Sequence, residues 1–203
     1  MNKPLCYAGI GSRSTPNIVG VEMGQWAKNL EDMGFVLRSG GAEGADTFFK
    51  EGTTKDTMRE IYVAGYAKQG DVAFDTLPLD IRKEALYLAS QHHPAWSRLS
   101  PYVQKLMARN ILQVLGKDLD NPSKFVLFWA KPKKDSFGNI YDAEGGTGLA
   151  VRFAYASGIP VYHVEDPESA LIKTAVFNKD MEALRHIYQN AHEKSAGPSG
   201  VKL

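Results

Sequence analysis

The amino-acid sequence predicts an α/β fold, a Rossmann-like three-layer domain with a mostly parallel sheet of about five or more strands. Short apolar segments alternate along the chain with longer segments of helical periodicity, which is typical of parallel sheets with helical crossovers. The segment 124–129 carries an unbroken apolar run, as expected of a central parallel strand that is covered on both faces. Glycine-rich turns stand where strands end or helices begin.

The elements follow one another in a regular order. We expect strands at 5–8, 35–37, 60–65, 124–129 and 159–164, and helices at 17–33, 45–51, 81–91, 101–115 and 146–157, with one or two more over 171–191. The first helix stops at a C-cap glycine, Gly34, and Pro94 separates the two middle helices. The polar segments 65–80 and 131–144 are interpreted as irregular surface loops. Right-handed crossovers favour the strand order 3-2-1-4-5.

Length and composition limit the class of protein. The 203 residues predict one domain over 1–192 and a flexible tail over 193–203. The formal net charge is +1, so an overall basic excess for holding a polyanion is absent. The single cysteine, Cys6, excludes an internal disulfide and is interpreted as a buried core thiol. With no signal-peptide pattern and no apolar run of ~20 residues, we expect a cytoplasmic protein without a membrane partner.

Three glycine-rich turns carry the candidate chemistry. They are Gly9-Ile10-Gly11-Ser12-Arg13, Ser39-Gly40-Gly41-Ala42-Glu43-Gly44-Ala45-Asp46 and Gly145-Gly146-Thr147-Gly148. Glycine lets the backbone approach a ligand closely, and the free N–H groups at a helix start attract anions. Each motif alone could be only a tight turn. All three at strand or helix ends predict a cradle for a phosphate-bearing nucleotide. The chain has no GxxxxGK[ST] motif, which disfavours a P-loop NTPase.

Polar side chains accompany these turns. Arg13 can make a bidentate contact to phosphate, or can be an ordinary surface arginine. Glu43 and Asp46 can accept ribose hydroxyls or a proton, although acids also favour the first turn of a helix. Hydroxyls that can bind phosphate or cap helices come from Ser12, Ser39 and Thr147. Arg109-Asn110, amid apolar neighbours, either points into a site or lies on the wet face of its helix.

Other residues offer weaker signals. The five histidines, at 92, 93, 163, 186 and 192, lack metal-ligand spacing, so no metal site is expected. His92-His93 can contact a base or form a helix-end feature, and stacking on a base is open to Tyr7, Trp96, Trp129 and Tyr141. A basic run on the loop after the central strand is interpreted either as a lid over phosphate or as a solvated loop: Lys131, Lys133 and Lys134.

The order of these motifs resembles the superfamily that joins the DNA-processing protein DprA/Smf to the LOG (lonely guy) proteins, known as SLOG. The resemblance covers roughly residues 5 to 164 and is closest to the DprA branch. It implies a Rossmann-like fold, a homodimer or higher homo-oligomer, and ligands that are nucleotides or single-stranded DNA. By analogy, the residues lining the anion pocket are Arg13, Ser39, Gly40, Asp46, Arg109 and Asn110. From this comparison we expect neither the amino-terminal helical module nor the winged-helix tail of most DprA proteins.

The LOG branch hydrolyses the bond between a base and ribose 5'-phosphate, with a motif of the form Pro-Gly-Gly-x-Gly-Thr-x-x-Glu. Here Glu144 replaces the proline, Leu149 the threonine and Val151-Arg152 the acid region. LOG-type catalysis is therefore disfavoured unless another acid substitutes, and the candidates are Asp46, Glu43, Glu144 and Asp142.

The sequence thus favours a protein that holds a nucleotide or ADP-ribose-like ligand as a sensor, carrier or sequestering protein, without a required cofactor. The predicted ligand-binding residues are Gly9, Gly11, Ser12, Arg13, Ser39, Gly40, Gly41, Glu43, Asp46, Arg109, Asn110, Gly145, Gly146, Thr147 and Gly148. Two alternatives stay open. The first is a DprA-like protein that binds single-stranded DNA in recombination, and the second is a nucleotide N-glycoside hydrolase with a relocated acid.

Overall fold

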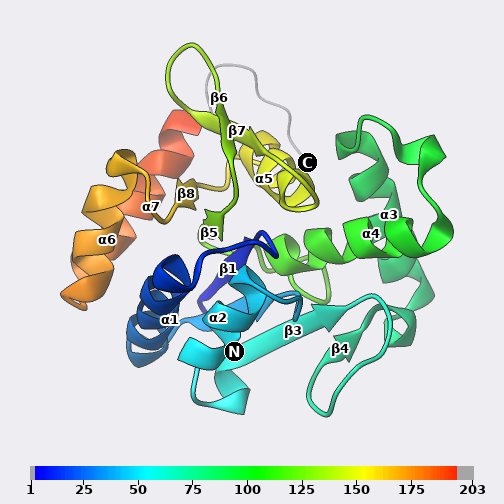
Figure 1. Ribbon diagram of the computed structural model, residues 1–203, viewed down its shortest axis with the longest axis horizontal. Coiled ribbons are helices and arrows are strands. Elements are labelled where there is room, and N and C mark those ends of the chain that lie inside the picture. The colour runs from blue at the N-terminus through cyan, green and yellow to red at the C-terminus, as the bar shows by residue number, and fades with distance from the viewer. Residues whose placement is uncertain (1–2, 196–203) are drawn as a thin grey trace.

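A parallel sheet of six strands, in the order β4-β3-β2-β1-β5-β8, forms the centre of the computed structural model, which describes residues 3–195 (Figure 1). Every neighbouring pair in this sheet is parallel. A separate antiparallel pair, β6-β7, follows β5. The strands are β1 Cys6–Gly11, β2 Val36–Ser39, β3 Arg59–Val63, β4 Val72–Ala73, β5 Val126–Trp129, β6 Pro132–Lys134, β7 Ile140–Ala143 and β8 Val161–His163.

Helices cover both faces of the sheet and give the three layers. They are α1 Asn17–Asp32, α2 Ala45–Gly52, α3 Leu79–His92, α4 Pro101–Leu115, α5 Thr147–Ala156, α6 Ala170–Phe177 and α7 Met181–Ser195. One core cluster joins the sheet to α3, α4 and α5, and a second joins it to α1, α2, α6 and α7. Alternation along β5 feeds both: Val126 and Phe128 enter the first cluster, and Leu127 enters the second. The Rossmann-like α/β fold predicted from the sequence is confirmed.

The strand order places a switch point at the centre of the sheet. The chain runs from β1 outward through β2 and β3, and then crosses to the other side of β1 to form β5 and β8. For the five main strands this is the predicted order 3-2-1-4-5. The connections after β1 and β5 therefore diverge to opposite sides, and a crevice opens at their carboxyl ends, where ligands bind in open α/β sheets.

Two segments expected to be irregular loops contain strands. The 65–80 segment includes β4, which adds a short parallel edge beside β3. The 131–144 segment forms the β6-β7 hairpin, whose turn is organised by Asp135: its Oδ1 accepts the N–H groups of Phe137 and Asn139. Gly138, at φ +89°, completes that turn. The hairpin carries few apolar residues and is held in place by ion pairs. Hydrophobic periodicity therefore did not predict it.

The remaining elements agree closely with the sequence. The 171–191 region forms two helices, α6 and α7, and α7 ends at Ser195. The rest of the predicted tail, 196–203, lies outside the described residues. Cys6 is fully buried, and burial raises the pKa of its thiol to about 11, as expected of a core cysteine. None of the helices within residues 3–195 is long and apolar enough to cross a membrane.

Candidate functional site

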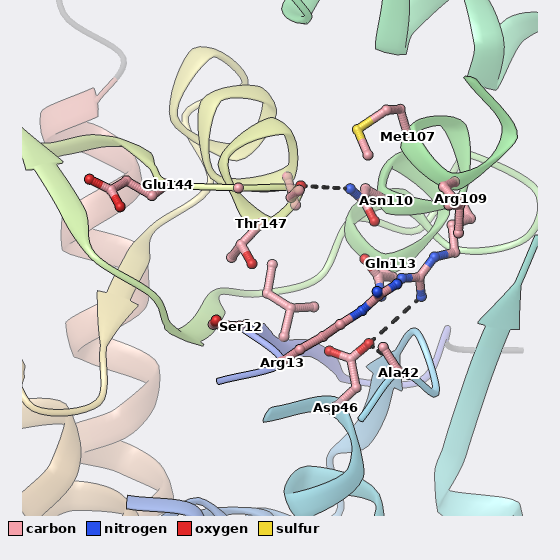
Figure 2. A pocket seen from close by; sticks show the side chains of 16 residues that line it. Ser12, Arg13, Ala42, Asp46, Met107, Arg109, Asn110, Gln113, Glu144 and Thr147 are labelled. Carbon is pink, nitrogen blue, oxygen red and sulfur yellow. Dashed lines mark hydrogen bonds and ion pairs between the residues drawn. The ribbon is translucent and has the colours of Figure 1, made fainter. Parts of the chain in front are cut away.

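A pocket of about 410 Å³ opens at the switch point of the sheet, between the ends of β1 and β2, the start of α5 and one face of α4 (Figure 2). Its volume is within the range of pockets that hold small-molecule ligands. The lining residues are Ile10, Gly11, Ser12, Arg13, Ala42, Asp46, Leu106, Met107, Arg109, Asn110, Gln113, Glu144, Gly145, Gly146, Thr147 and Ala150. Parts of all three glycine turns and the Arg109-Asn110 pair, which are far apart in the sequence, therefore meet at one place.

The first turn gives the pocket a backbone wall and one cation. Gly11 has no room for a side chain, because a Cβ there would overlap the carbonyl oxygen of Trp129. The N–H of Ser12 donates to that same oxygen at 2.8 Å, and its Oγ contacts the Oγ of Ser14. Arg13 is exposed and makes no hydrogen bond or ion pair with the described residues. Gly9 lies outside the pocket, and its lack of a side chain lets Leu37 and Phe49 pack against β1.

The second turn supports the pocket more than it lines it. Ser39 is fully buried and donates its hydroxyl to the carbonyl of Gly9 at 2.7 Å. Gly40 stands against the Arg109 side chain, with which an added methyl group would collide. Gly41 adopts φ +69° and does not line the pocket. Glu43 is exposed and also lies outside the lining.

Asp46 and Arg109 form a buried pair at the side of the pocket. Their closest atoms, Asp46 Oδ2 and an Nη of Arg109, are 3.7 Å apart, and Asp46 also accepts the N–H of Ala42 at 3.2 Å. Burial raises the pKa of Asp46 above its ordinary value, and the Arg109 guanidinium opposes that rise. The same Nη donates to the carbonyl of Tyr62 at 3.2 Å. The Arg109 Nε is buried without a hydrogen-bond partner in residues 3–195.

The third turn places the start of α5 at the pocket. Asn110 is buried and donates its Nδ2–H to the carbonyl of Gly146 at 3.0 Å, so α4 fixes the position of this turn. Within residues 3–195, the backbone N–H groups of Gly146 and Thr147 have no acceptor. Such free N–H groups at a helix start attract anions. Gly148 lies behind the turn, where a Cβ would overlap the carbonyl of Ala143.

The candidate acid Glu144 has its carboxylate turned away from Arg109 and Asn110 (Figure 2). It pairs with Lys131 at 3.0 Å. The two other lysines of the basic run also face carboxylates: Lys133 pairs with Asp142 at 2.8 Å, and Lys134 pairs with Asp166 at 2.6 Å. The first two pairs join the two sides of the β6-β7 hairpin, and the third ties the hairpin to the segment after β8. They favour the interpretation of these lysines as part of a structured surface segment rather than as a lid.

The remaining sequence candidates lie outside the pocket lining. His92 packs edge-on against Phe153, with ring centroids 5.2 Å apart. His93 Nδ1 accepts the N–H of Ala95 at 3.2 Å, which makes the histidine pair a helix-end feature. Among the four aromatic residues proposed for base stacking, Tyr7 is buried in the core and Trp129 donates its indole N–H to Glu165. Among the described residues, none that lines the pocket carries an aromatic ring.

One polar residue of the pocket was not predicted from the sequence. Gln113 lines the pocket from α4 and is only 2% exposed. Helical spacing could have indicated it, because positions 106, 109, 110 and 113 share one face of the helix that carries the Arg109-Asn110 motif. Ile10, Ala42 and Ala150 supply small or apolar lining between the turns.

The charges of the lining balance except at one residue. Four lining residues are charged: Arg13, Asp46, Arg109 and Glu144. Asp46 and Arg109 compensate each other, and Glu144 pairs with Lys131. Within the described part of the chain, Arg13 is the lining charge without a counterion. The pocket therefore has a net positive character of about one charge, to which the start of α5 adds a partial charge of roughly +0.5.

The parallel sheet and its helical layers define the class of the protein, a Rossmann-like α/β protein. Its pocket lies at the switch point of the sheet, where proteins of this class bind ligands. The structure is similar to that of DNA processing protein A from Helicobacter pylori, a protein with a single-stranded DNA binding mode. The TM-score is 0.49 at 17% identity, covering 94% of this chain and 81% of that chain. No protein-family model and no curated protein matches the sequence. The residues of the site itself must therefore indicate the function.

Proposed function

We propose that this chain binds a phosphate-bearing nucleotide, with the phosphate at the rim of the pocket. The observation that carries the proposal is a group of unsatisfied donors facing one cavity. Arg13 has no counterion, and Gly146 and Thr147 have free backbone N–H groups, all within the described residues. An anion that accepts hydrogen bonds from these donors gains charge-assisted contacts.

The charge balance favours one phosphate over a polyphosphate or a long polyanion. Only Arg13 contributes an uncompensated full charge among the described lining residues, and the α5 start adds a partial one. A ligand with several phosphates would place its additional charges where the described lining offers no further uncompensated cation. A nucleoside monophosphate, or one phosphate of a larger molecule, fits this field best.

The geometry favours binding over hydrolysis. A catalytic carboxylate needs an oxygen free to face the substrate. Glu144 is paired with Lys131 and turned away, and Glu43 lies outside the lining. Asp46 lines the pocket, but its oxygens face the N–H groups of Ala42, Gly11 and Gly40 and the Arg109 guanidinium. Asp46 is therefore proposed to position Arg109 and the turns, rather than to act on the ligand.

Single-stranded DNA is the second candidate, and the position of Arg13 favours it. Arg13 is exposed at the mouth of the pocket, so a phosphate within a longer strand can reach it without entering fully. The DprA-like motif order agrees with this alternative. With one uncompensated cation, we expect a shallow salt dependence, a slope of about −0.7 in a plot of log affinity against log salt.

Calorimetric titration tests the proposal. We expect one of the nucleoside monophosphates AMP, GMP, CMP and UMP to bind. Arg13→Ala should weaken that binding about 10- to 100-fold, because it removes a charge-assisted contact to the phosphate. Arg185→Ala removes an exposed arginine of α7 and serves as the matched control with unchanged affinity. Equal affinity in wild type and Arg13→Ala would refute the site. Tighter binding of a labelled oligonucleotide than of any mononucleotide would favour the second candidate, and release of free base, detected by chromatography, would show hydrolysis.

A further inference from the structure

The side-chain amide of Gln113 reaches the surface of the pocket and makes no hydrogen bond with the described residues. Gln113 lies on α4 and is 2% exposed, and that small exposure belongs to the pocket that it lines. Its backbone carbonyl accepts the hydroxyl of Ser123 at 3.1 Å, but its side-chain amide makes no hydrogen bond with residues 3–195. Because the amide faces the pocket and has no protein partner, a ligand group inside the pocket can take the place of water and pair with it.

The surroundings of Gln113 divide the pocket into two parts. The deep part is lined by buried Ile10 and Ala150 and by the Gln113 amide, which carries no charge. The rim carries exposed Arg13 and the turn that leads into α5. An anion is stabilised at the rim, whereas in the deep part it would lose hydration and meet only the Asp46–Arg109 pair, whose charges compensate each other.

We infer that Gln113 binds the uncharged nucleoside part of the ligand, while the rim holds its phosphate; this inference rests on the proposed function. A glutamine amide offers one carbonyl acceptor and two N–H donors. Ribose hydroxyls and base edges both donate and accept, so they can satisfy the amide in the deep part. The oxygens of a nucleotide's dianionic phosphate only accept, and they leave the glutamine carbonyl unpaired. Gln113 therefore determines specificity for a nucleoside over a bare phosphate.

The experiment compares two probes on two variants. The probes are the nucleoside monophosphate that binds wild type most tightly, measured by calorimetry, and inorganic phosphate, measured by NMR titration at millimolar concentrations. Gln113→Met keeps the length of the side chain and removes the amide. We expect its affinity for the nucleotide to fall about tenfold, as for the loss of one buried neutral hydrogen bond, and its affinity for inorganic phosphate to stay unchanged. Arg13→Ala should weaken both.

The stability of the unliganded variant supplies a second readout. Because the amide has no partner in the free protein, Gln113→Met should leave the melting temperature unchanged or raise it, whereas a structural glutamine would lower it. If Gln113→Met fails to fold, Gln113→Asn, which keeps the amide on a shorter side chain, replaces it with the same expected split between the two probes.

Each outcome separates the inference from the proposed function. Equal nucleotide affinity in wild type and the Gln113 variant would mean that only water pairs with the amide. That result overturns the inference and leaves the proposed function standing. Parallel losses for nucleotide and phosphate also overturn it. A wild-type protein that binds neither probe contradicts the proposed function, and the inference fails with it.

Discussion

Gly40→Ala probes how the pocket is built, because the sequence places a glycine where the structure needs empty space. Gly40 has no positive φ, so its backbone conformation suits alanine. A Cβ at this position would collide with the Arg109 guanidinium and lie 2.6 Å from Asp46 Oδ2. The substitution therefore acts on the buried pair itself rather than through backbone strain.

The magnitude follows from what Arg109 loses when it moves. Its hydrogen bond to the Tyr62 carbonyl and its ion pair with Asp46 are both disrupted. Breaking a fully buried pair costs about 3–5 kcal/mol. Arg109 lies at the pocket wall and can turn toward water there, so we expect a smaller loss of about 2–3 kcal/mol. For a chain of this length, that loss lowers the melting temperature by roughly 4–12 °C.

Thermal and urea unfolding of a double-mutant cycle test this account. The cost of Gly40→Ala should fall by more than half in an Arg109→Ala background, where the colliding group is gone. Gly24→Ala is the matched control: its Cβ would make ordinary contact at 3.6 Å with the Phe48 carbonyl, and inside α1 it should stabilise by about 0.5–1 kcal/mol. An equal cost of Gly40→Ala in both backgrounds would refute the reasoning.

Three further results are expected. Burial opposes a low pKa for Asp142, but the hydrogen bond from Lys133 lowers that pKa, so the ionised Asp142 stabilises the fold above about pH 4 and this stabilisation is lost as the pH falls. Asp142→Asn should therefore reduce the loss of the urea midpoint at acid pH, and an unchanged acid loss would contradict this role of Asp142. Burial lowers the pKa of His92 and His163, so their contribution to the free energy of unfolding is complete above about pH 6.5 and decreases toward pH 5. A urea midpoint that stays constant from pH 7.5 to 5.5 would contradict this contribution. Cys6 should resist iodoacetamide at pH 8 until urea unfolds the protein, and rapid labelling of the native protein would contradict its burial.

The fold could be predicted from the sequence because its strongest signals are local. The apolar run at 124–129 and the helical periodicity of 101–115 depend on burial by whole layers, which any parallel α/β domain provides. The meeting of the three turns was also predictable, since parallel strands bring their carboxyl ends to one edge. The hairpin β6-β7 was missed because ion pairs and the Asp135 turn stabilise it, rather than apolar alternation.

The roles of single residues in the site were harder to predict. Sequence alone could not show that Ser39 bonds to Gly9, that Gly40 makes room for Arg109, or that Glu144 turns toward Lys131, because each contact joins segments distant in the chain. Glutamine has no charge, so a lone glutamine in a helix gives no signal of a site. An ion pair within the sheet was missed because it also joins segments distant in the chain: buried Arg38 donates to half-buried Glu60 at 2.8 Å.

The proposed function requires that the unsatisfied donors at the pocket rim hold the phosphate of a nucleotide. NMR titration of ¹⁵N-labelled protein with a nucleoside monophosphate tests it most directly. We expect the backbone amides of Gly146 and Thr147 to shift together on saturation, and Arg13→Ala to weaken the response of both. Saturation with the nucleotide while these two resonances stay in place would contradict the proposed function.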